Sequence, residues 1–247
     1  MKSMTTAPTV GLLYPGYGAE DDFPALESRL GGAVRMPLVH TSVGEDAHRV
    51  DALLDLGSAP RLAAGAAALA EHHPDSVMWA CTSGSFVFGW DGARRQVDEI
   101  ARLIELPVSS TSLAFVQAAQ AMGLGRVAVA ASYPEAVASH FVDFLANGGI
   151  EVAGFASHGI VTAAEVGLLR EQEVVEMVRS LDTAGAEALL IPDTAMHSLA
   201  WLDALEDAAG MPVLTANQVT LWGGLRLLGD VPRLDGLGSL FRSDGRQ

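Results

Sequence analysis

Residues 77–85 read Val-Met-Trp-Ala-Cys-Thr-Ser-Gly-Ser, an apolar run that breaks into small turn residues at the only cysteine of the chain, Cys81. A short apolar run bounded by turn residues predicts a buried strand that ends in a loop. Because ligands of open α/β sheets bind at the carboxyl ends of strands, Cys81 stands where chemistry is expected. The alternative is that Cys81 is one more small buried side chain, since free cysteine is among the most buried residue types.

This strand end has a counterpart later in the chain. Three landmarks occur twice in the same order: residues 10–15 and 129–134 end in Tyr-Pro, residues 77–82 match residues 189–194, and residues 106–111 match residues 211–216. Asp193 takes the place of Cys81 in the second copy, and Thr194 takes the place of Thr82. Because repeats of this length fix the architecture, we expect two similar halves.

Helical patterns separate the predicted strands. They cover residues 61–72, 91–105, 112–122, 165–181 and 198–210, and another helix is expected to start at residues 133–135. Strands that alternate with helices predict parallel sheets with both faces covered. We therefore expect an α/β fold of two similar parallel-sheet domains with the active site in the cleft between them. Residues 1–110 with 218–247 would form the half that carries Cys81, and residues 111–217 the half that carries Asp193.

Composition narrows the classes of function. The 247 residues carry 30 acidic and 15 basic side chains, for a net charge of −15, and Lys2 is the only lysine. Without a basic patch, binding to nucleic acid or to an acidic membrane surface is disfavoured. One cysteine excludes an internal disulfide, and no Cys/His cluster has the spacing of a metal site. No signal-peptide pattern or long apolar stretch is present, so we expect a cytoplasmic protein without a membrane span.

Cys81 and Asp193 are equivalent under the repeat. Two ionisable groups that approach a small substrate from opposite sides suit an enzyme that moves protons or adds to a double bond. The alternative for Asp193 is a helix-capping or turn residue. An anionic substrate would be held by hydroxyl and backbone N–H donors, because the chain offers few cations.

The chain resembles the aspartate/glutamate racemase superfamily, specifically its branch of maleate cis-trans isomerases and arylmalonate decarboxylases. The resemblance rests on Cys81-Thr82-Ser83, on the strand end Ser132-Tyr133 and on residues 210–213, Gly-Met-Pro-Val. It implies cofactor-independent isomerisation of a small carboxylate or dicarboxylate, no metal, and a homodimer or higher homo-oligomer. It also implies that Cys81 is the nucleophile and that Thr82, Ser83 and Tyr133 hold a substrate carboxylate. Pro15 and Thr194 would complete the substrate pocket.

Two departures from that pattern leave the reaction open. Asp193 stands where relatives with two-sided chemistry carry a second cysteine, and residues 16–18, Gly-Tyr-Gly, replace a loop with an asparagine in maleate isomerases. The alternatives are a decarboxylase or racemase in which Cys81 and Asp193 exchange protons, and a binding protein without activity. In the isomerase, we expect nearby donors and a helix after Ser83 to lower the thiol pKa. Asp193 would exchange a proton if the cleft raised its pKa.

Overall fold

A computed structural model describes residues 7–16 and 18–242 of the chain. The first six residues, which carry no signal-peptide pattern, lie outside the described residues. So does Tyr17 of the first loop. Among the described residues, no helix is both long and apolar enough to cross a membrane. The same residues contain no group of three or more His, Cys, Asp or Glu side chains placed to hold a metal ion.

The strands form two four-stranded, all-parallel sheets, which confirms the predicted α/β fold class. The first sheet has the order β2-β1-β3-β4 and the second has the matching order β6-β5-β7-β8. The repeat in the sequence is thus a repeat of topology, because β1 to β4 correspond one by one to β5 to β8. The strands are β1 (Val10–Tyr14), β2 (Leu38–His40), β3 (Ser76–Trp79), β4 (Val108–Ser110), β5 (Arg126–Ala131), β6 (Glu151–Ser157), β7 (Ala188–Ile191) and β8 (Val213–Thr215).

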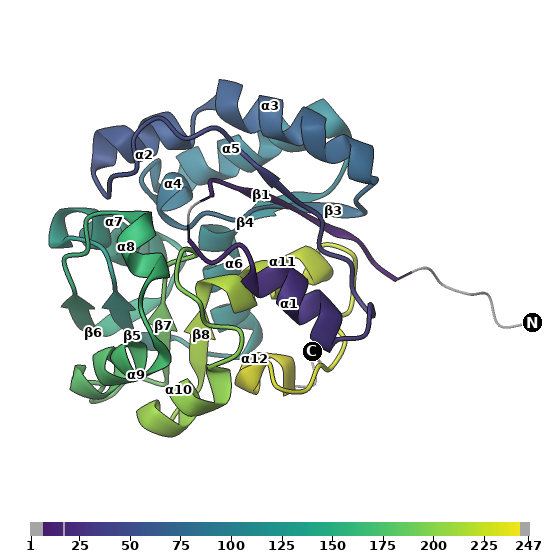
Figure 1. Ribbon diagram of the computed structural model, residues 1–247. Coiled ribbons are helices and arrows are strands. Elements are labelled where there is room, and N and C mark those ends of the chain that lie inside the picture. The colour runs from purple at the N-terminus through teal and green to yellow at the C-terminus, as the bar shows by residue number, and fades with distance from the viewer. Residues whose placement is uncertain (1–6, 17, 243–247) are drawn as a thin grey trace, which may run out of the picture.

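Helices connect successive strands and cover the sheets. The sheets occupy separate parts of the molecule, with α6 and α11 between them (Figure 1). The helices are α1 (Asp22–Arg29), α2 (Val50–Leu56), α3 (Ala59–Leu69), the 3₁₀ helix η1 (Ala70–His72), α4 (Ser83–Phe86), α5 (Gly89–Ile104), α6 (Thr111–Ala121), α7 (Glu135–Asn147), α8 (Ala163–Gly167), α9 (Glu171–Ser180), α10 (Leu202–Ala209), α11 (Ala216–Arg226) and α12 (Gly238–Arg242).

Three predicted helix boundaries are wrong. The helix expected over residues 198–210 begins only at Leu202, as α10. The single helix expected over residues 165–181 is two helices, α8 and α9, because Arg170 takes an extended backbone and caps α9 together with Glu173. The N-cap of α6 is Ser110, whose side chain accepts a hydrogen bond from the Leu113 N–H, rather than Ser112. Ser112 instead donates to the carbonyl oxygen of Thr82 at 2.7 Å and so supports the loop after Cys81.

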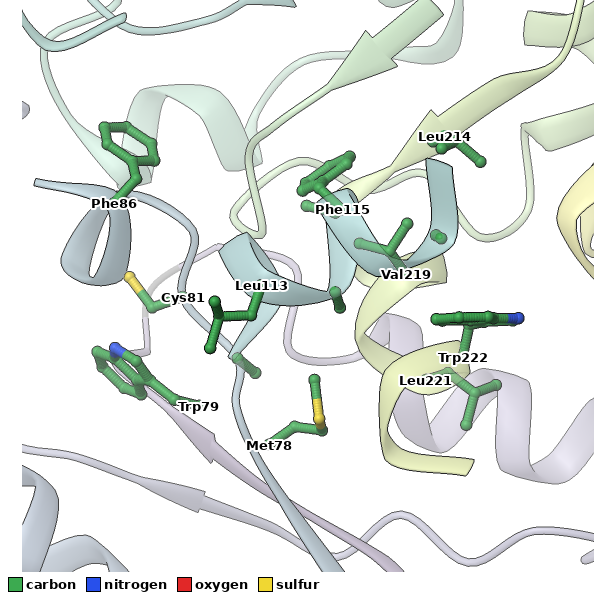
Figure 2. Close-up of a cluster of buried hydrophobic side chains, with 14 of the residues drawn as sticks. Met78, Trp79, Cys81, Phe86, Leu113, Phe115, Leu214, Val219, Leu221 and Trp222 are labelled. Carbon is green, nitrogen blue, oxygen red and sulfur yellow. The ribbon is translucent and has the colours of Figure 1, made fainter. Parts of the chain in front are cut away.

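The packing of α6 against α11 joins the two halves. One cluster of buried hydrophobic residues runs from β1 and β3 through α6 and α11 to the second sheet, as Figure 2 shows around Met78, Phe115 and Val219. Gly224 of α11 lies so close to β1 that a Cβ there would come within 2.2 Å of Val10 Cγ1. Glycine at this position lets the backbone of α11 lie directly on the first sheet. A second cluster covers the other face of the second sheet, and α12 contacts α10 and β8.

Candidate active site

Cys81 lies in the loop between β3 and α4, two residues beyond the carboxyl end of the strand. Its Sγ accepts a hydrogen bond from the Gly84 N–H at 3.3 Å and lies 3.9 Å from Ser83 Oγ. A Cβ on residue 84 would lie 3.0 Å from that sulfur, so a side chain there would crowd the thiol. Gln96 of α5 fixes the turn by donating to the carbonyl oxygens of Gly84 and Gly57, at 3.0 and 2.7 Å.

The protonation state of Cys81 differs from the sequence-based expectation. Burial raises the pKa of the Cys81 thiol to about 12, while the hydrogen bonds from Gly84 and Ser83 lower it and the charge of Asp193 raises it further. The side chain is only 3% exposed, and the loss of hydration outweighs the donors that were expected to stabilise a thiolate. The expectation of a lowered pKa is therefore wrong for the free protein, in which Cys81 is a protonated thiol at neutral pH.

Asp193 lies at the equivalent position of the second sheet, two residues beyond the carboxyl end of β7. Its Oδ2 accepts a hydrogen bond from Ser132 Oγ and its Oδ1 accepts one from the Ala195 N–H at 2.9 Å. Burial raises the pKa of the Asp193 carboxyl, and the charge of His48 and the bonds from Ser132 and Ala195 oppose that rise. The raised pKa agrees with the expectation for a group that exchanges protons in the cleft.

Cys81 and Asp193 line one cavity of about 40 Å³, which is room for about three water molecules. Three more residues singled out from the sequence, Ser83, Pro15 and Thr194, also line it. The cavity thus brings together residues from the carboxyl ends of β1, β3 and β7. An apolar wall formed by Val43, Leu53 and Leu56 completes it.

Thr82 and Tyr133 lie behind the cavity wall rather than on it. The Tyr133 hydroxyl donates to the carbonyl oxygen of Pro192, and the whole side chain is buried. The Tyr133 hydroxyl also lies within reach of the side chains of Thr82 and Ser83. Thr82 Oγ1 is buried and has no hydrogen-bond partner among the described residues. These side chains are therefore close to the Cys81 loop, but none of their polar atoms opens directly on the cavity.

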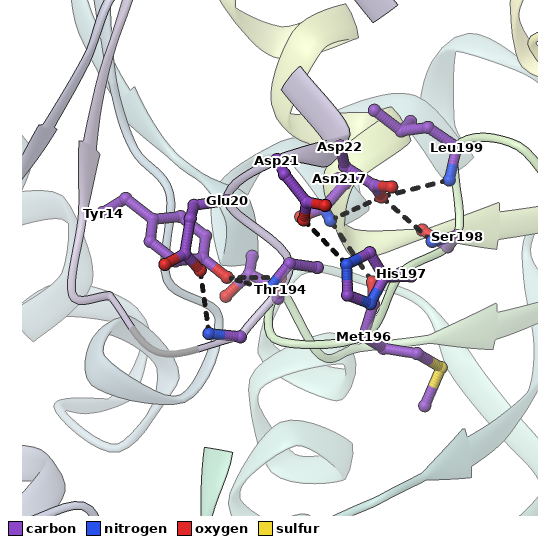
Figure 3. Close-up of polar contacts among 12 residues, drawn as sticks. Tyr14, Glu20, Asp21, Asp22, Thr194, Met196, His197, Ser198, Leu199 and Asn217 are labelled. Atoms are coloured by element: carbon purple, nitrogen blue, oxygen red, sulfur yellow. Dashed lines mark hydrogen bonds and ion pairs between the residues drawn. The ribbon is translucent and has the colours of Figure 1, made fainter. Parts of the chain in front are cut away.

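Contacts between the two halves set the shape of the loop that follows Asp193. Tyr14, at the end of β1, donates to the carbonyl oxygen of Thr194 at 2.9 Å and accepts from the Ala19 N–H at 2.9 Å (Figure 3). Asp22 of α1 accepts hydrogen bonds from the backbone N–H groups of Ser198 and Leu199, at 3.0 and 3.2 Å (Figure 3). Both residues belong to the first sheet's half and hold the second half's loop in place.

A segment that carried no sequence signal closes the cavity. Residues 41–49 connect β2 to α2 and place Glu45, Asp46 and His48 on the cavity wall. Asp46 accepts hydrogen bonds from the N–H groups of Ala163 and Ala164 at the start of α8, at 2.8 and 3.1 Å. The segment has no counterpart among the repeated landmarks, so sequence reasoning missed it.

His48 is the second contact of this segment with the other half. Its backbone N–H donates to the carbonyl oxygen of Val161 at 2.7 Å, and its Nδ1 lies 2.8 Å from the carbonyl oxygen of Ile160. The imidazole packs edge to face on the ring of Tyr133, with 4.8 Å between ring centroids. His48 is 8% exposed and lines the cavity, so its ring is fixed between the two halves.

The charges around the cavity are mostly negative. The carboxyl groups of Glu45, Asp46 and Asp193 line it, and the described lining residues include no lysine or arginine. His48 is the lining residue that can become a cation. Apart from His48, the groups on the wall that could hold an anion are hydroxyl and backbone N–H donors. His197, near Asp193 in the sequence, pairs with the exposed Asp21 at 2.7 Å and is not among the lining residues (Figure 3).

The chain is similar to known enzymes in both sequence and fold. Over 255 aligned residues, the chain is 28% identical to a maleate isomerase from Nocardia farcinica (strain IFM 10152), covering 95% of this chain and 96% of that protein. The structure of a cysteine-to-serine mutant of Nocardia farcinica maleate cis-trans isomerase, with a covalently bound succinylcysteine intermediate, matches with a TM-score of 0.86 and 24% identity, covering 96% of this chain and 99% of that chain.

Arylmalonate decarboxylase is similar in fold as well. A double mutant of that enzyme in its liganded form matches with a TM-score of 0.83 and 22% identity, covering 95% of this chain and 98% of that chain. At these identities the structural matches show a shared fold. A family model described as arylmalonate decarboxylase matches residues 57–241, which include both Cys81 and Asp193. Because this match spans most of the sequence, the chain belongs to the arylmalonate decarboxylase family.

Proposed function

We propose that the protein is a cofactor-independent isomerase of a small dicarboxylate that acts as maleate isomerases do, with Cys81 as the nucleophile. The observation that carries the proposal is the shared cavity, in which Cys81 and Asp193 lie at equivalent strand ends of two matching sheets. The near full-length similarity to a maleate isomerase supports the substrate class. The related structure with a succinylcysteine intermediate supports covalent chemistry at a cysteine.

The reaction begins with a proton transfer, because the Cys81 thiol is protonated in the free protein. Cys81 gives its proton to the Asp193 carboxylate, and the thiolate forms a carbon–sulfur bond with one carbon of the double bond. The π electrons move onto the neighbouring carboxylate as an enediolate, and the former double bond, now single, rotates. The enediolate then expels the thiolate as the double bond re-forms, and Cys81 recovers its proton from Asp193.

The remaining predicted residues bind and shape the substrate. Ser83 lines the cavity and, with backbone N–H groups of its loop, would hold the carboxylate on which the enediolate charge develops. Thr82 would join it once its side chain turns from behind the wall toward the cavity. Tyr133 lies behind both residues, and Pro15 and Thr194 shape the opposite side of the pocket. The buried and unpartnered Thr82 Oγ1 supports this role, since such an atom is a spare donor beside the site.

Decarboxylation of an arylmalonate-type substrate, or racemisation of a small carboxylate, is the second candidate. The pKa of about 12 favours it, because a protonated thiol is ready to deliver a proton. In decarboxylation, the bond to one carboxyl group breaks, carbon dioxide leaves, and the resulting enediolate takes the proton of Cys81. Solvent then restores the proton on sulfur. The apolar wall of Val43, Leu53 and Leu56 is compatible with a substituent on such a substrate.

Proton NMR in deuterated water, with a panel of small cis and trans dicarboxylates and substituted malonates, tests the proposal. We expect interconversion of cis and trans isomers without release of carbon dioxide. Mass spectrometry after an acid quench should find the substrate bound to Cys81. Stoichiometric carbon dioxide release with deuterium on the α-carbon would instead establish the decarboxylase. If no substrate of the panel is turned over by the wild type, and the substrates only bind, the protein is a binding protein.

The organisation of the chain completes the proposal. The two halves would be residues 1–110 with 218–247, and residues 111–217. The placement of α11 on the first sheet supports this division. A homodimer or higher homo-oligomer is the expected state by resemblance to the family, and the cytoplasm is the compartment expected from the sequence. Size-exclusion chromatography with light scattering measures the oligomer directly.

A further inference from the structure

His48 lines the cavity but belongs to no sequence motif and takes part in no step of the mechanism above. Its Nδ1 faces the carbonyl oxygen of Ile160 at 2.8 Å, and a carbonyl oxygen can only accept a hydrogen bond. Nδ1 therefore carries a hydrogen in both the neutral and the charged ring. The proton that His48 gains or loses is consequently the one on Nε2.

The Nε2 atom has no hydrogen-bond partner among the described residues, although His48 is held on three sides. The backbone is bound to Val161, Nδ1 to Ile160, and the ring rests on Tyr133. His48 lines the same cavity as Asp193, so a charge on its ring acts on that carboxyl group.

Two other acidic groups on the cavity wall, Glu45 and Asp46, have partners of their own. Asp46 holds the N–H groups of Ala163 and Ala164, and Glu45 forms an ion pair with Arg49 at 3.0 Å. The remaining titratable groups that line the cavity are Tyr14, Cys81 and Asp193. Of these three, Asp193 is the group that must be an anion in the proposed mechanism, and a cation in the cavity would stabilise that anion.

We propose that the His48 imidazolium is the counter-charge that keeps Asp193 ionised, so that Asp193 can accept the proton of Cys81. His48 is thus a positioning residue, which acts through Asp193 rather than on the reacting atoms. Without a nearby cation, a carboxyl group buried in this cavity would stay protonated and could not serve as the base. The sign of the electrostatic interaction agrees, since the charge of His48 lowers the pKa of Asp193.

This inference rests on the proposed function, because it assigns Asp193 the role of proton acceptor. The test uses His48→Asn, whose side-chain amide can still donate to the Ile160 carbonyl oxygen but carries no charge. We expect the acidic limb of kcat/KM to move to higher pH in this variant, since Asp193 then remains protonated over a wider range. The loss should be about tenfold near pH 6 and should shrink as the pH rises. A loss of equal size at every pH would overturn the proposal.

A matched control and a readout without turnover separate the possible failures. His72→Asn, at the exposed end of η1, should leave the pH profile unchanged. NMR of the ¹⁵N-labelled imidazole rings should show His48 protonated at Nδ1 throughout, and its titration midpoint should move to lower pH in Asp193→Asn. An unchanged midpoint overturns the His48–Asp193 interaction even if the protein is an isomerase. A shifted midpoint without any isomerase turnover keeps the interaction and rejects the proposed function.

Discussion

Cys81 and Asp193 occupy equivalent strand ends, yet the two halves treat them differently. The loop after β3 folds into α4 and turns the Gly84 N–H and the Ser83 hydroxyl toward the sulfur. The loop after β7 forms no helix before α10, and it is held by Tyr14 and Asp22 from the other half. The thiol therefore finds its hydrogen-bond partners within its own loop, while the loop that carries Asp193 is held by residues of the other half.

Equivalent strand ends in this fold thus carry two different groups, a thiol that gives a proton and a carboxylate that accepts it. Burial raises the pKa of both groups, and the Cys81 thiol, with a pKa of about 12, is protonated at neutral pH. Asp193 has a cationic partner in His48, whereas Cys81 faces the negative charge of Asp193. The proton therefore rests on sulfur in the free protein, and a substrate must trigger its transfer. Four experiments test this contrast.

Cys81→Ser should have the largest effect. We expect kcat/KM to fall at least about 10³-fold, because a serine hydroxyl is a much poorer nucleophile than a thiolate and Asp193 is too weak a base to activate it. Turnover is followed by NMR, and an unchanged melting temperature shows that the fold is intact. Activity within tenfold of the wild type would mean that another group performs the chemistry.

Asp193→Asn should come next, with kcat/KM about 10²-fold lower. An asparagine can keep both local hydrogen bonds, by donating to Ser132 and accepting from Ala195, so the loss reports the missing base rather than a changed loop. Asp21→Asn, which changes an exposed carboxyl group outside the cavity, is the control and should leave the kinetics unaltered. A fully active Asp193→Asn would remove Asp193 from the mechanism.

The two repeated tyrosines compare the halves through stability. Tyr14→Phe should lower the free energy of unfolding by about 1–3 kcal/mol, because the Thr194 carbonyl and the Ala19 N–H both lose a buried partner. Tyr133→Phe removes one hydrogen bond, to the Pro192 carbonyl oxygen, and Thr82 and Ser83 can turn to other partners, so we expect a smaller loss. Urea denaturation measures both values. A larger loss for Tyr133→Phe would contradict the idea that the second half's loop depends on the first half.

The smallest effect concerns the reactivity of the thiol. With a pKa of about 12, the thiolate fraction of Cys81 rises about tenfold for each pH unit between pH 7 and 10, and so should its rate of alkylation by iodoacetamide. In Asp193→Asn the rate should be several-fold higher at each of these pH values, because the charge of Asp193 raises the thiol pKa. An equal rate in both proteins would show that the two groups do not interact electrostatically.

Much of the architecture was predictable from the sequence because the repeat marks equivalent strand ends. The landmarks at Tyr14, Cys81 and Pro107 recur at Tyr133, Asp193 and Pro212, and the two sheets have the same strand order. The repeat also predicted that Cys81 and Asp193 lie near each other, and both line one cavity. The break between α8 and α9 was not predictable, because it depends on the extended backbone of Arg170 rather than on a proline or a glycine-rich turn.

The sequence was least informative about the environment of the site. The sequence predicted a lowered thiol pKa because donors near Cys81 can be inferred from neighbouring residues. The burial that raises this pKa depends on how the halves pack, which the local sequence does not show. His48 was missed for a similar reason. Its contacts with Ile160 and Tyr133 and its electrostatic effect on Asp193 join positions far apart in the chain, and no local pattern marks a single histidine in a polar loop.

Residues of both halves line the cavity, so the binding of a ligand there can be detected through the stability of the whole chain. A small molecule that fills the cavity touches both halves, so its binding energy adds to the free energy of unfolding of the whole chain. At a concentration one hundred times its dissociation constant, such a ligand contributes about 2.7 kcal/mol. For a chain of this size that corresponds to roughly 5–11 °C in melting temperature. Thermal-shift screening of carboxylate libraries against Cys81→Ser would therefore identify candidate substrates by affinity, before any product is known.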